Sequence, residues 1–288
     1  MIVSTVCAYG TNETEPDMVD YPDHNSESVE AWEANAEFWD EAQGDEGNYW
    51  QRTLVFPSTL ELLQPLPTTV LELACGNGNF ARQLSRVGVA VTATDASEGQ
   101  LRGARQRSGG DKIKWIRLDV TDRSALAALS GAAGAPFGAA VCNMALMDIA
   151  EITPLFDMLP LSLVDEAPFV FSVLHPVFRP GPQVRLFRER IETEDGQFIE
   201  ESGVKISNYL DTRVNYGIAV KGQPSIQPYF DRTLTELFST AFDRGWALDG
   251  IREPSITDGG DGDAEGRLSW DHMPNIPPVM VARLRHRG

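Results

Sequence analysis

Two glycines and two acids mark one loop as a candidate ligand site. In the stretch VLELACGNGNFA an apolar run ends at Gly76 and Gly78, which with Ala81 fit the G-x-G-x-x-A pattern of a ligand-binding turn. Asp95 lies 19 positions after Gly76, where a carboxylate can accept hydrogen bonds from both hydroxyls of an adenosine ribose. Glu72 would repel a pyrophosphate but would suit an ammonium group. The pattern therefore favours an adenosine ligand with an amino-acid tail over a dinucleotide.

Further side chains could take a proton from an acceptor or bind a base. His175 follows the strand-like run PFVFSVL, and an imidazole there can act as a general base near neutral pH, although a histidine before proline can also be structural. Asp148 is the competing base, with N-capping of the following helix as the alternative. Asp119, in IRLDVTD, can accept from an adenine amino group or cap a helix. The sequence leaves each pair of roles open.

A regular alternation of strands and helices positions these residues. Runs such as TVLEL, VAVTATD, FGAAVCN and PFVFSVL alternate with helical segments, and this predicts β-α-β units. The expected fold class is α/β, a doubly wound, Rossmann-like, mostly parallel sheet of seven strands, with WALDGIREP and PVMVARLRHR as antiparallel edge strands. In such a sheet a ligand lies beyond the carboxyl ends of the strands. The residues that end the five parallel strands include Glu72, Asp95, Asp119, Asn143 and His175.

Other segments are expected to cover this core. Residues 1–25 are polar and aperiodic and predict a flexible acidic arm. Residues 26–66 predict an N-terminal helical cap, because apolar residues recur there at helical spacing, and residues 67–175 form the predicted ligand-binding core. Residues 176–230 break the rhythm with alternating patterns and a Gly turn, which predicts an inserted β lid over the substrate. Residues 231–288 return to the core sheet.

Composition restricts the partners of the chain. It has 288 residues, a formal net charge of -18 at pH 7 and no apolar stretch that could span a bilayer. This charge would repel a phosphate backbone, so neither nucleic acid nor a membrane is expected as a partner. The acidic start lacks the basic region of a targeting segment, so a cytoplasmic location is expected. Three cysteines without C-x-x-C spacing predict buried thiols.

Four motifs together resemble those of the class I S-adenosylmethionine-dependent methyltransferases. VLELACGNGNFARQL, VTATDAS, RLDV and VCNMALMDI occur in the family's order and at family-like spacing, over about residues 27–175 and more loosely after residue 230. The resemblance is closest to bacterial and fungal enzymes of secondary metabolism. It implies S-adenosyl-L-methionine as cofactor and in-line methyl transfer to O, N or S of a small-molecule metabolite. The motifs of the nucleic-acid and the metal-dependent catechol branches are absent, so no catalytic metal is expected.

The resemblance also assigns roles to residues. It implies that Glu72 faces the methionine part of the cofactor, Asp95 the ribose and Asp119 the adenine. Ala74 stands where the family most often has a glycine, and we expect it to keep a negative φ. The predicted cofactor-binding residues are Trp50, Glu72, Ala74, Cys75, Gly76, Asn77, Gly78, Asp95, Ala96, Ser97, Asp119, Val120, Asn143, Met144 and Ala145.

The acceptor side is predicted from the aromatic cap and the strand ends. Trp39 and Trp50 could stack on a sulfonium or an apolar acceptor, whereas Trp32 is expected to be core. The predicted substrate-binding residues are Trp39, Met147, His175 and Phe178, and the predicted catalytic residues are His175 and Asp148. Two alternative functions stay open, an NAD(P)-dependent oxidoreductase of Rossmann type and a non-catalytic cofactor-binding regulatory protein. A homodimer is compatible with the sequence.

Overall fold

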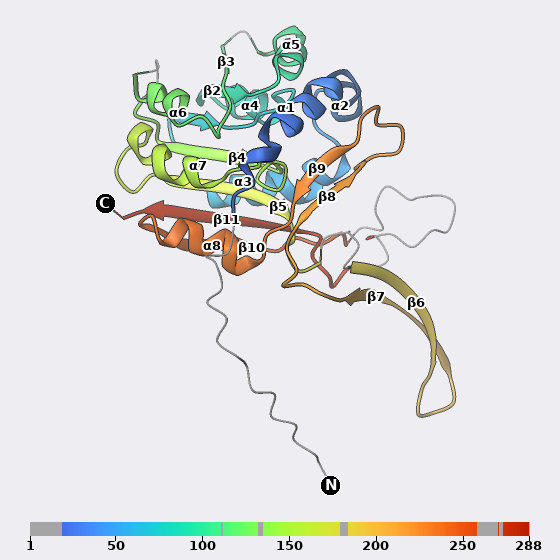
Figure 1. Ribbon diagram of the computed structural model, residues 1–288. Helices are drawn as coiled ribbons and strands as arrows, with labels where there is room; N and C mark the ends of the chain where they lie inside the picture. The colour runs from blue at the N-terminus through green and yellow to red at the C-terminus, as the bar shows by residue number, and fades with distance from the viewer. Residues whose placement is uncertain are drawn as a thin grey trace.

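A mostly parallel sheet forms the centre of the molecule (Figure 1). The computed structural model describes residues 19–110, 112–131, 135–178, 184–257, 270 and 273–287, so most of the predicted N-terminal arm lies outside the described residues. The strands of the sheet are β1 (Thr69–Glu72), β2 (Ala90–Asp95), β3 (Lys114–Arg117), β4 (Ala139–Asn143), β5 (Pro168–Leu174), β10 (Trp246–Arg252) and β11 (Val279–His286). Their order is β10-β11-β5-β4-β1-β2-β3.

Strand directions confirm the doubly wound α/β fold, with one difference in detail. β1 to β5 pair in parallel, and β11 is antiparallel to both β5 and β10. The expectation that both C-terminal strands lie at an edge holds for β10 only, because β11 lies between β10 and β5. Val279, Val281 and Leu284 are fully buried, as the continuous apolar run VMVA of an interior strand would indicate.

Helices cover both faces of the sheet. Successive strand residues point to opposite faces, so Leu71 joins one buried cluster and Val70 the other. The first cluster packs under α6 (Arg123–Ala128), α7 (Thr153–Met158) and α8 (Leu234–Phe242). The second packs under α3 (Phe56–Leu62), α4 (Asn79–Arg86) and α5 (Glu98–Gln106). Short 3-10 turns occupy Pro22–His24, Leu129–Gly131 and Leu159–Ser162.

The N-terminal region is helical. α1 (Asn25–Ala34) and α2 (Ala36–Gln43) replace the single helix that the apolar spacing suggests, and a π-helical turn at Gln51–Val55 leads into α3. The break falls at Asn35, whose side chain donates to Ser225 O at 2.9 Å and accepts from Ser225 N at 2.8 Å. α2 lies close against α5 at Gly99, where an added Cβ would come within 2.6 Å of the Cβ of Ala36. Small residues on α5 thus let the N-terminal helices approach the core.

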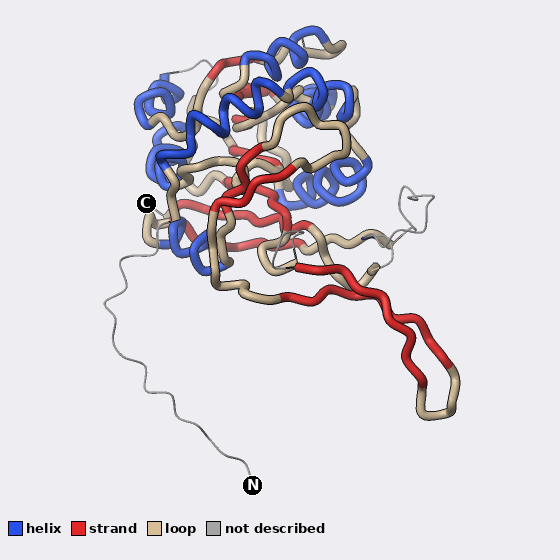
Figure 2. Tube along the Cα trace, turned by 45° about the vertical axis from the view of Figure 1, so that its right-hand side comes forward, coloured by secondary structure: helices blue, strands red, loops and turns tan. Residues whose placement is uncertain are grey.

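The segment between β5 and α8 contains two hairpins with different positions. β6 (Val184–Glu192) and β7 (Phe198–Ile206) form a long antiparallel ribbon that projects away from the sheet, as Figure 2 shows. β8 (Val214–Gly217) and β9 (Gln227–Phe230) form a shorter one, and β9 contacts α1. The predicted division into domains, including a lid at residues 176–230, stays a prediction. Within the described ranges, no helix has both the length and the apolar character needed to cross a membrane.

Candidate active site

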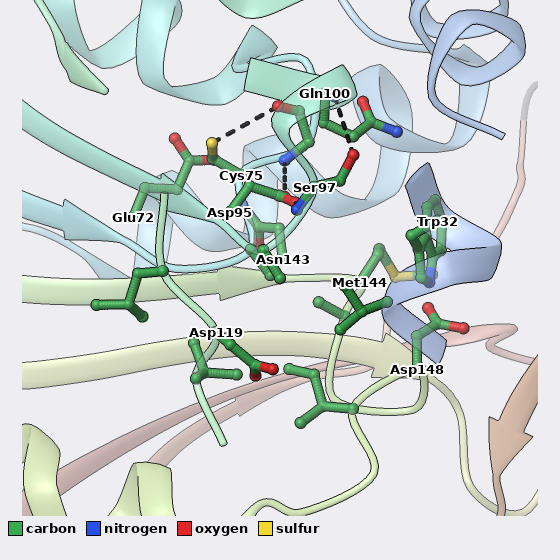
Figure 3. A pocket seen from close by; sticks show the side chains of 18 of the residues that line it. Trp32, Glu72, Cys75, Asp95, Ser97, Gln100, Asp119, Asn143, Met144 and Asp148 are labelled. Atoms are coloured by element: carbon green, nitrogen blue, oxygen red, sulfur yellow. Dashed lines mark hydrogen bonds between the residues drawn. The ribbon is translucent and has the colours of Figure 1, made fainter. Parts of the chain in front are cut away.

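A pocket lies at the carboxyl ends of β1 to β4, and Trp32 of α1 lies at one side of it (Figure 3). Its wall combines the loops that follow the four strands with side chains from the N-terminal helices. The residues that line it are Asn25, Ser28, Val29, Trp32, Gln43, Gln51, Phe56, Glu72, Ala74, Cys75, Gly76, Asn79, Phe80, Asp95, Ala96, Ser97, Gln100, Leu118, Asp119, Val120, Thr121, Asn143, Met144, Ala145, Asp148 and Ile149. The position is the one expected for the ligand of a parallel sheet.

The loop after β1 turns sharply through three left-handed residues. Ala74 has a φ of 49°, Gly76 of 56° and Gly78 of 72°. The expectation that Ala74 keeps a negative φ was wrong: the loop needs the left-handed region at this position whether or not a glycine occupies it. Gly78 is the N-cap of α4. A Cβ at this position would lie 2.2 Å from the Cη2 of Trp115, so a glycine is needed to leave room for the indole ring.

Two acids stand beside this loop in the pocket. Glu72 is 2% exposed, and burial raises its pKa to about 8, although the Arg82 guanidinium acts in the opposite direction. Asp95 accepts from Gly76 N at 2.8 Å and from Ser97 N at 2.9 Å, and burial raises its pKa to about 6. Asp95 therefore also holds the loop. An ammonium or hydroxyl donor from a ligand would stabilise both carboxylates in their charged form.

Several polar atoms in the pocket wall are buried without a hydrogen-bond partner. They are Trp32 Nε1, Glu72 Oε2, Gln100 Oε1 and Asn143 Nδ2. Buried polar groups in folded proteins are almost always hydrogen-bonded, so such atoms in one pocket indicate a polar ligand. The set holds both donors and acceptors. It fits a ligand that offers ammonium, hydroxyl and carboxylate groups together.

The end of β3 is fixed to the N-terminal helix. Asp119 accepts from Asn25 Nδ2 through Oδ2 and from Thr121 N through Oδ1, each at 2.9 Å. Asp119 does not cap the following helix. Asp122 is the N-cap of α6, and its side chain accepts from Ser124 N and Ala125 N. Asp119 thus lies at the pocket and joins it to α1.

Asp148 lies at the opposite side of the pocket from Glu72, in the loop after β4. It is 6% exposed, and burial raises its pKa to about 8. Gln227 Nε2 donates to Oδ1 of Asp148 at 3.0 Å. Asp148 does not cap the following helix, which was its alternative role. Asp20 does so instead and accepts from Ile152 N and Thr153 N where α7 begins. Figure 3 shows Asp148 beside Trp32 and Met144.

His175 is not among the residues that line the pocket. Its Nε2 lies 2.9 Å from Glu253 Oε1, and its Nδ1 accepts from Val177 N at 3.2 Å. Nδ1 is then unprotonated, and the Nε2 proton points to Glu253, so neither nitrogen is free to take a proton from an acceptor. Burial lowers the pKa of His175, against the effect of Glu253. Its ring packs on Phe178 at 4.6 Å.

The structure brings most of the predicted cofactor residues together but not the predicted aromatic ones. From that set, Asn77, Gly78 and Trp50 fall outside the lining, and from the predicted acceptor set only Asp148 lies in it. Met147 and Phe178 pack beside the hydrophobic clusters, and His175 packs on Phe178. Trp39 is buried and packs against the rings of Trp32 and Phe38. Trp32, expected as core, lines the pocket instead. The lining residues that the sequence did not indicate are Asn25, Ser28, Val29, Trp32, Gln43, Gln51, Phe56, Asn79, Phe80, Gln100, Leu118, Thr121 and Ile149.

The fold and the pocket define a Rossmann-like α/β protein with the architecture of class I methyltransferases. Residues 70–159 match the family model described as a methyltransferase domain. This match lies within the part of the chain whose motifs resemble those of the class I, S-adenosylmethionine-dependent methyltransferases, and it agrees with that resemblance. A solved structure, the S-adenosylmethionine dependent methyltransferase from Mesorhizobium loti, is 19% identical with a TM-score of 0.56, covering 80% of this chain and 96% of that one.

Two curated relatives match part of the chain. An uncharacterized methyltransferase of Mycobacterium bovis is 33% identical over 103 residues, 35% of this chain and 49% of its own length. The chain thus spans about half the length of this relative. A cis-4-hydroxycyclohexanecarboxylate dehydrogenase of Sinomonas cyclohexanicum is 42% identical over 72 residues, 25% of this chain and 29% of that protein.

Proposed function

We propose that this protein is a methyltransferase that transfers a methyl group from S-adenosylmethionine to a small-molecule metabolite. The observation that carries the proposal is the pair of acids at the glycine loop, the buried Glu72 and the half-buried Asp95. An enclosed pair of carboxylates favours a ligand that carries both an ammonium group and ribose hydroxyls. We further propose a cytoplasmic enzyme that has no nucleic-acid or membrane partner. Secondary metabolism as its setting and a homodimer as its assembly stay predictions.

Each part of the cofactor has residues that would hold it. Glu72 and the loop backbone at Gly76 would bind the amino-acid tail, and Asp95 would accept from the ribose hydroxyls. The wall at Asp119 and Val120 would take the adenine. The side-chain nitrogen Nδ2 of Asn143, which has no partner, lies where the loop after β4 begins and would donate to the ligand.

The cofactor supplies a methyl group on a sulfonium that a nucleophile can displace in line. The contribution of the protein is alignment and exclusion of water, which can account for much of the rate of such a reaction. Phe56, Phe80, Val29 and Ile149 give the pocket an apolar lining. Since both ring nitrogens of His175 are engaged, Asp148 is the preferred group to hold an acceptor or take its proton.

Ligand binding separates methyltransferase from oxidoreductase. We expect S-adenosylhomocysteine to raise the melting temperature of the purified protein, because a ligand selective for the native state stabilises it by mass action. NAD and NADP should give no shift, since neither offers Glu72 an ammonium group that would stabilise its charged form. Asp95→Asn should reduce the affinity for S-adenosylhomocysteine about 10- to 100-fold in calorimetry, and Asp165→Asn, outside the pocket, serves as the matched control. A shift with NAD or NADP alone would overturn the proposal.

A further inference from the structure

Asp148 is a buried acid without a cationic partner. No Lys, Arg or His side chain of the described residues forms an ion pair or hydrogen bond with it, and its carboxyl group receives only the bond from Gln227. The guanidinium of Arg232 instead donates to the main-chain oxygens of Leu146, Ile149 and Ala150, in the loop that carries Asp148. A buried carboxylate is costly unless a positive group compensates it. None of the residues that the structure describes supplies that group.

A chain of glutamines fixes the orientation of this carboxyl group. Gln223 Nε2 donates to Gln227 Oε1 at 2.8 Å, and Gln227 Nε2 donates to Asp148 Oδ1 at 3.0 Å. All three side chains are buried. Within the described chain no hydrogen bond reaches Oδ2 of Asp148, while the residue lines the pocket. The second oxygen is therefore available to a ligand in the pocket.

An indole ring completes the surroundings of this oxygen. Ser28 Oγ donates to the main-chain oxygen of Asp148 at 2.6 Å, which holds α1 against the loop. Trp32, one turn further along α1, lines the same side of the pocket, and Figure 3 shows it beside Asp148. A carboxylate next to an aromatic ring is an arrangement that binds organic ammonium groups, through charge and through the ring face.

We propose that the acceptor of this methyltransferase is an amine, which Asp148 binds as its ammonium form beside Trp32. The inference rests on the proposed function and names the substrate class for the same pocket. A neutral alcohol or thiol would not stabilise the charged form of Asp148. An ammonium group compensates it and brings the proton that must be removed before reaction.

The proton and electron balance of this step closes within the complex. The ammonium gives one proton to the Asp148 carboxylate, and the free amine attacks the methyl carbon. The carbon–sulfur bond breaks, its electron pair stays on sulfur, and the products are the methylated ammonium and a neutral thioether. Burial raises the pKa of Asp148 to about 8, so this carboxyl group accepts the proton of an alkyl ammonium more readily than an exposed aspartate would. Tyr229 and Cys142 also face Asp148, and burial raises the pKa of both above their usual range.

Matched acceptors test the proposal on the full chain. Two matched pairs are used, tryptamine with tryptophol and phenethylamine with phenethyl alcohol. Binding of each compound to the S-adenosylhomocysteine complex is measured by titration. Methyl transfer from trideuteromethyl-labelled S-adenosylmethionine is followed by mass spectrometry. We expect each amine to bind about tenfold or more tightly than its alcohol and the label to appear on nitrogen. Asp148→Asn, which keeps an oxygen for Gln227, should abolish this preference. Glu151→Gln, three residues along and outside the pocket lining, should keep it.

Three results would overturn the proposal. The first is that the amines do not bind more tightly than the alcohols, or that none of the four compounds binds. The second is that the label appears on oxygen. The third is an Asp148→Asn variant that loses affinity for S-adenosylmethionine but not for S-adenosylhomocysteine, because the carboxylate would then face the sulfonium. If S-adenosylhomocysteine itself does not bind the wild-type protein, the proposed function fails before the acceptor is tested.

Discussion

Ala74 holds a backbone conformation that disfavours any side chain. Its φ of 49° costs an L-residue about 1 to 2 kcal/mol relative to the right-handed region. Glycine removes this cost but loses about 0.5 to 1 kcal/mol through the greater freedom of the unfolded chain. We therefore expect Ala74→Gly to raise the free energy of unfolding by up to about 1 kcal/mol in urea titrations. Ala127→Gly, within α6, should lower it by about 1 kcal/mol, and a loss of stability at both positions would contradict this reading of the loop.

Glu72 and Asp148 give the ligand-free protein an unusual pH dependence. Each has a native pKa of about 8, well above its unfolded value, so the native state binds their protons more tightly. Their contribution to stability is fully present below about pH 4 and is lost as the pH rises through about 8. Melting temperatures without ligand should therefore fall between about pH 5 and pH 8.5. Glu72→Gln should flatten this fall, and an unchanged slope in that variant would show that Glu72 is charged at neutral pH in the native state.

Residues at strand ends could be predicted from the sequence because their position depends on local motifs. Glu72, Asp95 and Asn143 each close a recognisable strand, and all three line the pocket. Trp32 and Gln227 could not be predicted in the same way, since they reach the site from elements far away in the chain. Aromatic residues at helical spacing indicate a buried face of the helix but do not indicate which of the rings faces a ligand. The spacing therefore does not distinguish Trp32, which lines the pocket, from Trp39, which does not.

At the scale of elements, the contact between α2 and α5 depends on two glycines one turn apart. A Cβ at Gly99 would lie 2.6 Å from Ala36 Cβ, and one at Gly103 would lie 2.9 Å from Asp40 Cγ. Gly99→Ala gains helix propensity of about 1 kcal/mol, but the clash involves a neighbouring Cβ that cannot rotate away. We expect a net loss of about 1 to 3 kcal/mol in unfolding experiments. Gly131→Ala, with no atom within 4 Å of the added Cβ, should be close to neutral.

The clash in the Gly99→Ala variant should displace α1 and α2, and this distinguishes it from a substitution that only lowers the stability of the protein. α1 contributes four lining residues, and Glu33 on it accepts from Ser97 Oγ and Gly99 N. Gly99→Ala should therefore also weaken S-adenosylhomocysteine binding. An undiminished affinity in a destabilised variant would show that the helix pair adjusts without moving the pocket wall.

The strands and helices of the core could be predicted because each carries its own periodicity. The break at Asn35 could not, because it depends on a pair of bonds to Ser225, 190 residues away in the chain. The same limit applies to β11, whose place between β5 and β10 is decided by tertiary pairing rather than by its own pattern.

At the scale of the whole molecule, the ribbon of β6 and β7 stands apart from the pocket. None of its residues lines the site, and Phe198 and Ile199 near its tip are about half exposed. We expect a variant in which residues 190–200 are replaced by Asn-Gly, joining the paired Glu189 and Glu201, to keep wild-type affinity for S-adenosylhomocysteine within about twofold. Calorimetry on the two proteins measures this. A loss above about tenfold would support the lid that the sequence suggested for this segment.

The hydrogen bonds that hold α1 over the pocket have a consequence for the speed of exchange. Asn25 bonds to Asp119, Ser28 to the main chain of Asp148, Glu33 to Ser97 and the adjoining Asn35 to Ser225. We expect this helix to move when a ligand of the size of an adenosine derivative enters or leaves the pocket. Release is then limited by an opening of the protein rather than by the affinity of any single contact. Residence times should accordingly be long, and product release rather than methyl transfer would set the turnover rate.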